Sequence, residues 1–153
     1  MKTSIKKLLI FGANVNLMTQ FNQSVLYFAC LHCSDEIQLL LLEHPNIVVN
    51  DEVCYGQSIV HILCAKVGPA KEPVVLKKLL QMPSIPVQEG LFARVCKYRT
   101  QAHRIKVLDL LLQFGKVKLS LKEQYTAFAK MDSCDRDEIF ELIAKHTKNG
   151  YPW

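Results

Sequence analysis

Apolar residues recur along this chain in short clusters, each about as long as one or two turns of helix. The cluster Leu8-Leu9-Ile10-Phe11-Gly12 closely matches Leu111-Leu112-Gln113-Phe114-Gly115. Two related clusters lie between them at similar intervals, Leu41-Leu42-Glu43-His44-Pro45 and Leu79-Leu80-Gln81-Met82-Pro83. Intervals of roughly 20–50 residues are typical of repeat proteins, and each cluster predicts the end of an equivalent helix.

A second pattern runs in register with the first. The segment from Asn22 to Cys30 recurs in the same order of residue types from Gly56 to Cys64. Serine occupies the same place in both copies and is a favoured residue at a helix N-terminus, because its hydroxyl accepts a hydrogen bond from an unpaired amide of the first turn. The apolar residues that follow predict a helix that buries against the leucine-rich one. Two markers with one period therefore predict units of two helices.

These segments resemble the ankyrin repeat in a degenerate form. Gly56-x-Ser58-x-x-His61 is similar to the family's T-P-L-H-x-A signature, and Gly12-Ala13-Asn14-Val15-Asn16 is similar to its G-A-x-V-N lead-in to a hairpin. The resemblance implies an all-α fold, an ankyrin-repeat solenoid of stacked helix-turn-helix units joined by short hairpin loops. It also implies a structural role for His61, which in that family bonds to neighbouring backbone.

The whole chain fits a single repeat domain with unequal parts. Residues 1–16 form a half-unit, 17–50 and 51–86 are full units, 87–118 is a weak unit, and 119–148 are a helical C-terminal cap. The first cap helix carries Tyr125, Phe128 and Met131, and the second carries Ile139, Leu142 and Ile143. The last helix has acidic residues near its N-terminus, where negative charge stabilises a helix: Asp135, Asp137 and Glu138.

The spacing inside the units predicts that two of them have a longer turn. In the first full unit the relevant interval runs from Ser24 to Leu41. The corresponding intervals, from Ser58 to Leu79 and from Gly90 to Leu111, are both longer by four positions. We therefore expect the turn between the helices to be longer by about that amount in the second and third units.

Composition and apolar run lengths favour a globular intracellular protein. Half of the 153 residues are hydrophobic and 8% are aromatic. Apolar runs such as Leu39–Leu42 are much shorter than the roughly 20 residues of a membrane span. The basic start, Met1–Lys7, precedes an apolar run that is too short for a secretory signal. We expect a soluble, cytoplasmic monomer whose six cysteines stay reduced.

The net charge of +5 is concentrated in the middle of the chain. Residues 66–122 hold 12 basic and 3 acidic side chains, whereas the segments on either side each carry a net −2. Most of the basic residues lie in or beside the two longer turns: Lys66, Lys71, Lys77, Lys78, Arg94, Lys97, Arg99, His103, Arg104 and Lys106. Three interpretations are open: a solvated surface, a site for an acidic protein segment, or a site for nucleic acid or anionic lipid.

Cys30-Leu31-His32-Cys33 has the C-x-x-C spacing of redox and zinc sites. The repeat favours another interpretation, because Cys30, Cys64 and Cys96 hold one equivalent position where a small buried side chain packs between helices. The chain contains no second pair to complete a zinc site and no recognised catalytic or phosphate-binding motif. We therefore predict neither metal nor cofactor, and no enzyme activity.

In ankyrin-repeat proteins the hairpin tips and the exposed end of the first helix usually bind partners. The resemblance places Gln20, Phe21, Gln23, Leu31, His32, Cys54, Tyr55, Gln57, Ala65, Lys66, Glu89, Lys97 and Tyr98 at such positions. Phe21 and Tyr55 are aromatic side chains expected at hairpin tips, where they either anchor an interface or pack on the next hairpin. Arg99 and Arg104 extend the candidate surface along the basic edge.

The predicted function is that of a protein-protein interaction module or scaffold, which binds a partner protein through its concave face or basic edge. An acidic partner would be attracted by the charge. The alternative is a non-catalytic targeting fragment of a larger regulator, enzyme or host-directed effector protein.

Overall fold

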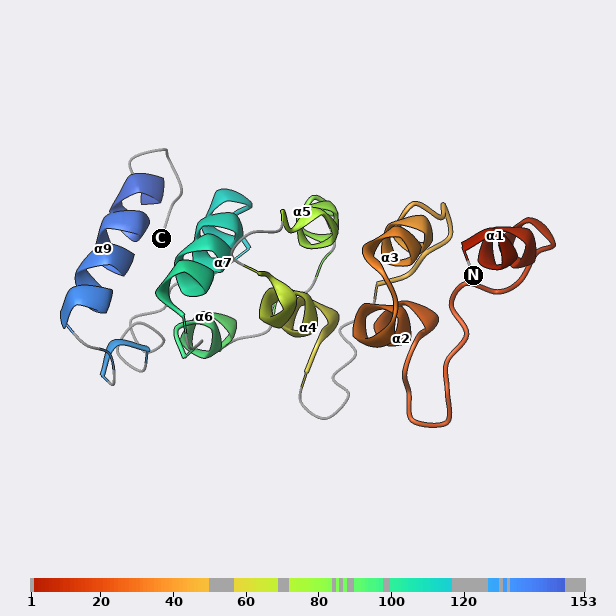
Figure 1. Ribbon diagram of the computed structural model, residues 1–153, viewed down its shortest axis with the longest axis horizontal. Helices are drawn as coiled ribbons and strands as arrows, with labels where there is room; N and C mark the ends of the chain where they lie inside the picture. Colours follow the sequence, from red (N-terminus) through yellow and green to blue (C-terminus); the bar gives the residue numbers. More distant parts are fainter. Residues whose placement is uncertain are drawn as a thin grey trace. The chain divides into compact units, whose positions relative to one another are not determined.

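The computed structural model describes residues 2–49, 57–68, 72–83, 85, 87, 90–97, 100–116, 127–129, 131 and 133–147 (Figure 1). The helices are α1 (Lys2–Ile10), α2 (Val25–His32), α3 (Asp35–Leu42), α4 (Ile59–Lys66), α5 (Val74–Leu80), α6 (Leu91–Val95), α7 (Gln101–Gln113) and α9 (Ser133–Thr147). An isolated antiparallel bridge joins Met18 and Ser24, and the described residues contain no longer β-strand. The predicted all-α class is thus confirmed for the described part of the chain.

The chain divides into two compact units. The first consists of Met1–Leu63 and Val74–Pro86, and it contains α1, α2, α3, α5 and the start of α4. The second consists of Cys64–Pro73 and Val87–Trp153, and it contains the end of α4 together with α6, α7 and α9. Each unit has its own buried apolar core.

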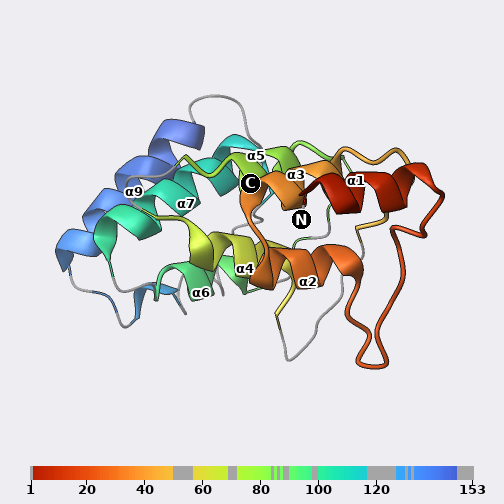
Figure 2. The ribbon, with the colours of Figure 1, turned by 45° about the vertical axis from the view of Figure 1, so that its right-hand side comes forward.

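The helix α3 is central to the first unit, because it packs on α1, α2 and α5. Figure 1 shows α1 and α2 both beside α3, and the turned view in Figure 2 shows the same neighbours. The fully buried side chains of this core include Leu26, Leu41, Leu76 and Leu79. Leu26, Leu41 and Leu79 come from the repeated segments, so the sequence pattern at these positions corresponds to the buried core.

Serine begins both of the predicted first helices. The Ser24 hydroxyl accepts a hydrogen bond of 3.1 Å from the Tyr27 amide, at the third residue of α2. The Ser58 hydroxyl accepts one of 3.4 Å from the His61 amide, at the third residue of α4. Each bond satisfies one of the amides that a helix N-terminus leaves unpaired. The predicted caps are therefore confirmed.

The repeated Leu-Leu-x-Phe-Gly sequence ends α1 and α7 in the same way. Gly12 and Gly115 both have a positive φ, of 83° and 59°, which glycine adopts without a steric penalty. The Gly12 amide donates to the Leu9 carbonyl and the next amide donates to Leu8, while Gly115 and Lys116 donate to Leu112 and Leu111. This is the Schellman arrangement of a helix C-terminus. The repeated Leu-Leu-x-Phe-Gly sequence therefore forms the same helix end in α1 and α7.

The turns between paired helices differ in length, as predicted. Two residues, 33 and 34, separate α2 from α3, whereas seven separate α4 from α5 and five separate α6 from α7. The short turn is fixed by the Gln38 side chain, whose amide donates a 2.8 Å hydrogen bond to the Cys33 carbonyl. The placement of several basic residues in these turns was wrong, because Lys77 and Lys78 belong to α5, and His103, Arg104 and Lys106 belong to α7.

In the second unit α7 packs on both α6 and α9. Phe92 is fully buried and its ring meets that of Phe128 edge-on, with the centroids 6.1 Å apart. Phe128 also stacks at a tilt on Phe140 of α9, at 4.7 Å. Phe128, Ile139 and Leu142 are buried, as expected for the C-terminal cap, whereas Tyr125 lies outside the described residues.

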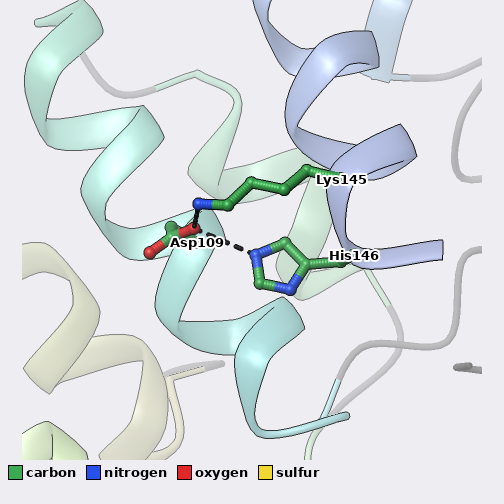
Figure 3. A network of polar contacts seen from close by, with 3 residues as sticks. All are labelled: Asp109, Lys145 and His146. Carbon is green, nitrogen blue, oxygen red and sulfur yellow. Dashed lines mark hydrogen bonds and ion pairs between the residues drawn. The ribbon is translucent and has the colours of Figure 1, made fainter. Parts of the chain in front are cut away.

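A polar network also joins α7 to α9 (Figure 3). Asp109 of α7 lies between two side chains of α9: its Oδ1 is 2.9 Å from His146 Nε2 and 3.5 Å from Lys145 Nζ. His146 is buried, and Asp109 supplies its partner at the edge of the apolar core. The Gln101 side-chain amide donates to Glu138 at the other end of the same pair of helices.

Candidate functional site

The segment between α1 and α2 is a hydrogen-bonded hairpin, formed by residues 17–24. Its backbone bonds run from the Val25 amide to the Leu17 carbonyl (3.2 Å), from Thr19 to Gln23 (2.9 Å) and from Asn22 to Thr19 (3.0 Å). The Thr19 hydroxyl accepts two further bonds, from the amides of Phe21 and Gln23, at 3.3 and 3.2 Å. The hairpin is therefore an ordered platform held by Thr19.

Apolar side chains project from this platform into solvent. Phe21 at the tip is 60% exposed, and Leu17 and Met18 on the incoming strand are also exposed. Gln20 is exposed and Gln23 is half-buried. The predicted residues of this tip are thus brought together on one loop. Leu17 and Met18, which were not predicted as site residues, belong to the same loop.

Leu31 and His32 lie at the opposite end of α2 from the hairpin. Leu31 is half-buried, while His32 is exposed and its ring contacts that of Phe28 at 4.6 Å. Val25 and His32 are seven residues apart, which is about 10 Å along a helix. The two predicted groups therefore flank the two ends of one short helix in the first unit.

The remaining predicted residues are divided between the units. Gln57 of the first unit is exposed, as are Lys66 and Lys97 of the second unit. Tyr55, Tyr98 and Arg99 lie outside the described residues, as do Cys54 and Glu89. Among the described residues of the candidate surface, those of the first hairpin and α2 therefore lie on adjoining elements of one unit.

The placement of Arg104 on an exposed basic turn was wrong. Arg104 belongs to α7 and is buried, and its Nη2 lies 2.6 Å from Asp135 Oδ2 in the first turn of α9. A charged side chain is buried in this way when a carboxylate compensates it. Arg104 therefore joins two helices of the second unit and does not contribute to an external charged surface.

Two other basic residues of the predicted turn bind backbone carbonyls in the last turn of α4 and just beyond it. His103 Nε2 lies 2.8 Å from the Cys64 carbonyl, and Lys106 Nζ donates a 3.1 Å hydrogen bond to the Gly68 carbonyl. Carbonyls near a helix C-terminus lack partners within the helix and carry partial negative charge. Three of the predicted basic residues thus serve the interior of the second unit, which weakens the case for a basic edge.

The ion pair of Arg104 and Asp135 gives a testable stability effect. We expect Arg104→Met and Asp135→Leu each to lower the free energy of unfolding by about 2 kcal/mol, since each leaves a poorly hydrated charge without its partner. The value is below that of a fully buried pair, because a quarter of the Asp135 side chain is exposed. Urea unfolding of the two single variants and the double variant measures it. The double variant should lose at least about 1 kcal/mol less than the sum; additive losses would contradict the pairing.

The repeated cysteines and His61 have the structural roles predicted for them. Cys30, Cys64 and Cys96 are all buried, and burial raises the pKa of the Cys64 thiol to about 12. Burial likewise raises the pKa of Cys96 to about 12, although the nearby charge of Arg104 acts in the opposite direction. Such thiols are protonated at neutral pH, whereas the nucleophilic form is the thiolate.

His61 is a buried part of the N-terminal turn of α4. Its Nδ1 accepts a 3.3 Å hydrogen bond from the Ser58 amide and lies 2.8 Å from the Ser58 hydroxyl oxygen. A ring nitrogen that accepts from an amide carries no proton, so a neutral imidazole fits this position. The expected bond to neighbouring backbone is confirmed.

Among the described residues no group of three histidine, cysteine or acidic side chains is arranged to hold a metal ion. The described helices also include none long and apolar enough to span a membrane. Comparisons with protein-family models, curated proteins and solved structures found no match for this chain. The candidate site therefore rests on the geometry of the first hairpin and α2.

Proposed function

We propose that this chain is a non-catalytic protein-interaction module of the ankyrin type, and that it binds a partner protein through the hairpin of residues 17–24. The observation that carries the proposal is an ordered hairpin with Phe21 exposed at its tip. An exposed phenylalanine on a preorganised loop loses little conformational entropy when it is buried in a partner, which is the property of an interface anchor.

The surroundings of Phe21 fit this role. Leu17 and Met18 add exposed apolar surface beside the tip, and Gln20 and Gln23 can supply hydrogen bonds at its rim. Protein interfaces commonly have such an apolar centre and polar edge. The resemblance of the repeats to the ankyrin family supports the same surface, because that family binds partners through its hairpin tips.

The proposal is tested by identifying what contacts position 21. A photo-crosslinking phenylalanine analogue at that position captures the partner from cell extract for identification, and the affinity of the purified partner is then measured by calorimetry. We expect Phe21→Ala to weaken binding by about 2 kcal/mol, or roughly 30-fold in Kd. The same change at Phe140, an exposed phenylalanine of the second unit, is the matched control and should leave Kd within about twofold.

Phe21→Ala should leave the free energy of unfolding unchanged within about 0.5 kcal/mol, because the ring is mostly exposed. A loss of affinity without a loss of stability therefore separates binding from folding. Equal affinities of the parent and Phe21→Ala for the crosslinked partner would show that the hairpin is not the binding surface.

A further inference from the structure

Exposed apolar side chains are concentrated at the start of the first unit. Large apolar residues that are exposed there are Leu8, Ile10, Phe11, Leu17, Met18, Phe21, Val25 and Phe28. In the rest of the described chain only Val48, Val74 and Phe140 are exposed in this way. Single exposed apolar residues are normal on a protein surface, whereas a concentration of them marks a surface that another molecule covers.

The helix α1 is the most exposed element of this region. None of its residues is buried, and half-buried Ile5 and Leu9 are its least exposed apolar positions. Phe11, directly after the helix, is 85% exposed, and Leu8 lies one turn before it. Every other helix of the described chain buries at least one side chain. The apolar residues of α1 thus lack the cover that all the other helices have.

The arrangement of neighbouring helices indicates what kind of element would cover the exposed apolar residues of α1 and α2. The helices form antiparallel pairs, α2 with α3 and α6 with α7, whereas α1 packs mainly on α3. On α2, Val25, Phe28 and His32 are spaced by three and four residues, so they share one face, and all three are exposed. A helix beside α2 that pairs with α1 would cover apolar residues of both helices.

The positive charge of this region indicates that the molecule bound there is acidic. Residues 1–34 contain no aspartate or glutamate, and Lys2, Lys6 and Lys7 are all on α1. Lys2 pairs with Glu36 of α3 at 3.1 Å, while Lys6 and Lys7 are exposed and make no ion pair within the described residues. A second copy of the chain, docked face to face, would bring these lysines together. An acidic partner would instead complement them.

We propose that α1 and the exposed face of α2 bind an acidic amphipathic helix of a partner protein. Its apolar side packs on Leu8, Phe11, Val25 and Phe28, and its carboxylates face Lys6 and Lys7. In this type of helix binding, the partner's contact residues are at positions i, i+3, i+4 and i+7 of its helix. A helix is favoured over a lipid surface because the apolar residues belong to two separate helices that both pack on α3, and a helix can contact both. This site is separate from the tip of the hairpin.

The probe is a synthetic peptide of about 18 residues, or five helical turns. It carries leucine at the i, i+3, i+4 and i+7 positions and glutamate and alanine elsewhere. A permuted peptide of the same composition without the helical periodicity, and a peptide with lysine in place of glutamate, are the controls. Binding to the full chain is measured by fluorescence anisotropy and located by amide chemical shifts of the ¹⁵N-labelled protein.

We expect the acidic helical peptide to bind at least about tenfold more tightly than either control peptide, with shift changes confined mainly to α1 and α2. Phe28→Ser should weaken binding about tenfold or more. Lys6→Glu/Lys7→Glu should reverse the preference in favour of the lysine peptide. The matched charge control, Lys78→Glu/Lys97→Glu, changes exposed lysines elsewhere and should keep the original preference.

Three results would overturn the inference. The permuted peptide could bind as tightly as the helical one, which would show that the site does not recognise an amphipathic helix. The parent could instead form a dimer in sedimentation equilibrium that Phe28→Ser dissociates, with no peptide binding. It could also bind phosphatidylserine vesicles but not the acidic peptide. Phe21→Ala should leave peptide binding unchanged, so the outcome is independent of the function proposed for the hairpin.

Discussion

Phe92→Ala should destabilise the second unit by about 3–5 kcal/mol. The Phe92 side chain is fully buried on α6, and its ring meets Phe128 edge-on in the core of that unit. Removing the ring takes away its apolar burial and leaves a cavity that the surrounding helices can only partly close. It also removes an aromatic pair, which contributes beyond the buried area.

Urea unfolding followed by circular dichroism measures this effect. Because the chain has two compact units, their unfolding transitions are followed separately. The NMR chemical shifts of the Phe128 ring report on the second unit. The matched control is Phe140→Ala, since Phe140 stacks on the same Phe128 ring but is 49% exposed. It should cost less than about half as much. Equal losses for the two variants would contradict the described core.

The second large effect is a loss of stability at alkaline pH that depends on two thiols. Cys64 and Cys96 both belong to the second unit, and burial raises the pKa of each from 9.0 to about 12. The folded state therefore keeps protons that the unfolded state releases above about pH 9. The thiol contribution is fully present below that pH and declines as the pH rises from 9 towards 12, with each thiol costing roughly 1–2 kcal/mol by pH 10.

The comparison of the parent with Cys64→Ala/Cys96→Ala isolates this contribution from the titration of lysine and tyrosine. The double variant has a lower stability at neutral pH, because it lacks two buried sulfur atoms, but its stability should depend less on pH. Between about pH 8 and pH 10 the parent should lose close to 3 kcal/mol more than the variant, with a reductant present throughout. Parallel pH profiles would show that the thiols are not buried in the folded protein.

Local features of the fold could be predicted from the sequence because they depend on few neighbouring residues. Ser24 and Ser58 both cap a helix, because a serine hydroxyl before an apolar run can accept a hydrogen bond from the first turn. Gly12 and Gly115 end helices, because glycine adopts a positive φ without a steric cost. The shared position of Cys30, Cys64 and Cys96 indicated their burial, since a repeat gives equivalent residues equivalent surroundings.

The roles of the charged residues could not be predicted in this way. Arg104 is one of several cations in a segment without acidic residues, and its partner, Asp135, lies beyond the end of α7, in the next described long helix. His103 and Lys106 bind backbone carbonyls that lie 39 and 38 positions before them, and a carbonyl leaves no mark in a sequence. A run of like charges therefore did not reveal which side chains face inwards, because that depends on how α7 packs.

The candidate surface was only partly foreseen for a related reason. Phe21 was identified because an exposed aromatic residue at a hairpin tip is typical of an interface anchor, with packing on the next hairpin as the open alternative. Leu8, Phe11 and Phe28 occupy positions where the repeat pattern predicts burial, yet they are exposed because no helix of the described chain covers α1. The apolar pattern describes what a helix can bury, and the neighbouring helices decide whether it is buried.

The two-residue turn between α2 and α3 also bears on the order in which the chain folds. This pair spans Val25–Leu42, so its helices meet after the closure of a very short loop, and Gln38 fixes the turn from within the pair. The contacts between α7 and α9 join residues 36 and 37 positions apart, which costs more chain entropy. Since local contacts form fastest, we expect α2 and α3 to be the nucleus of folding, and the second unit to assemble later.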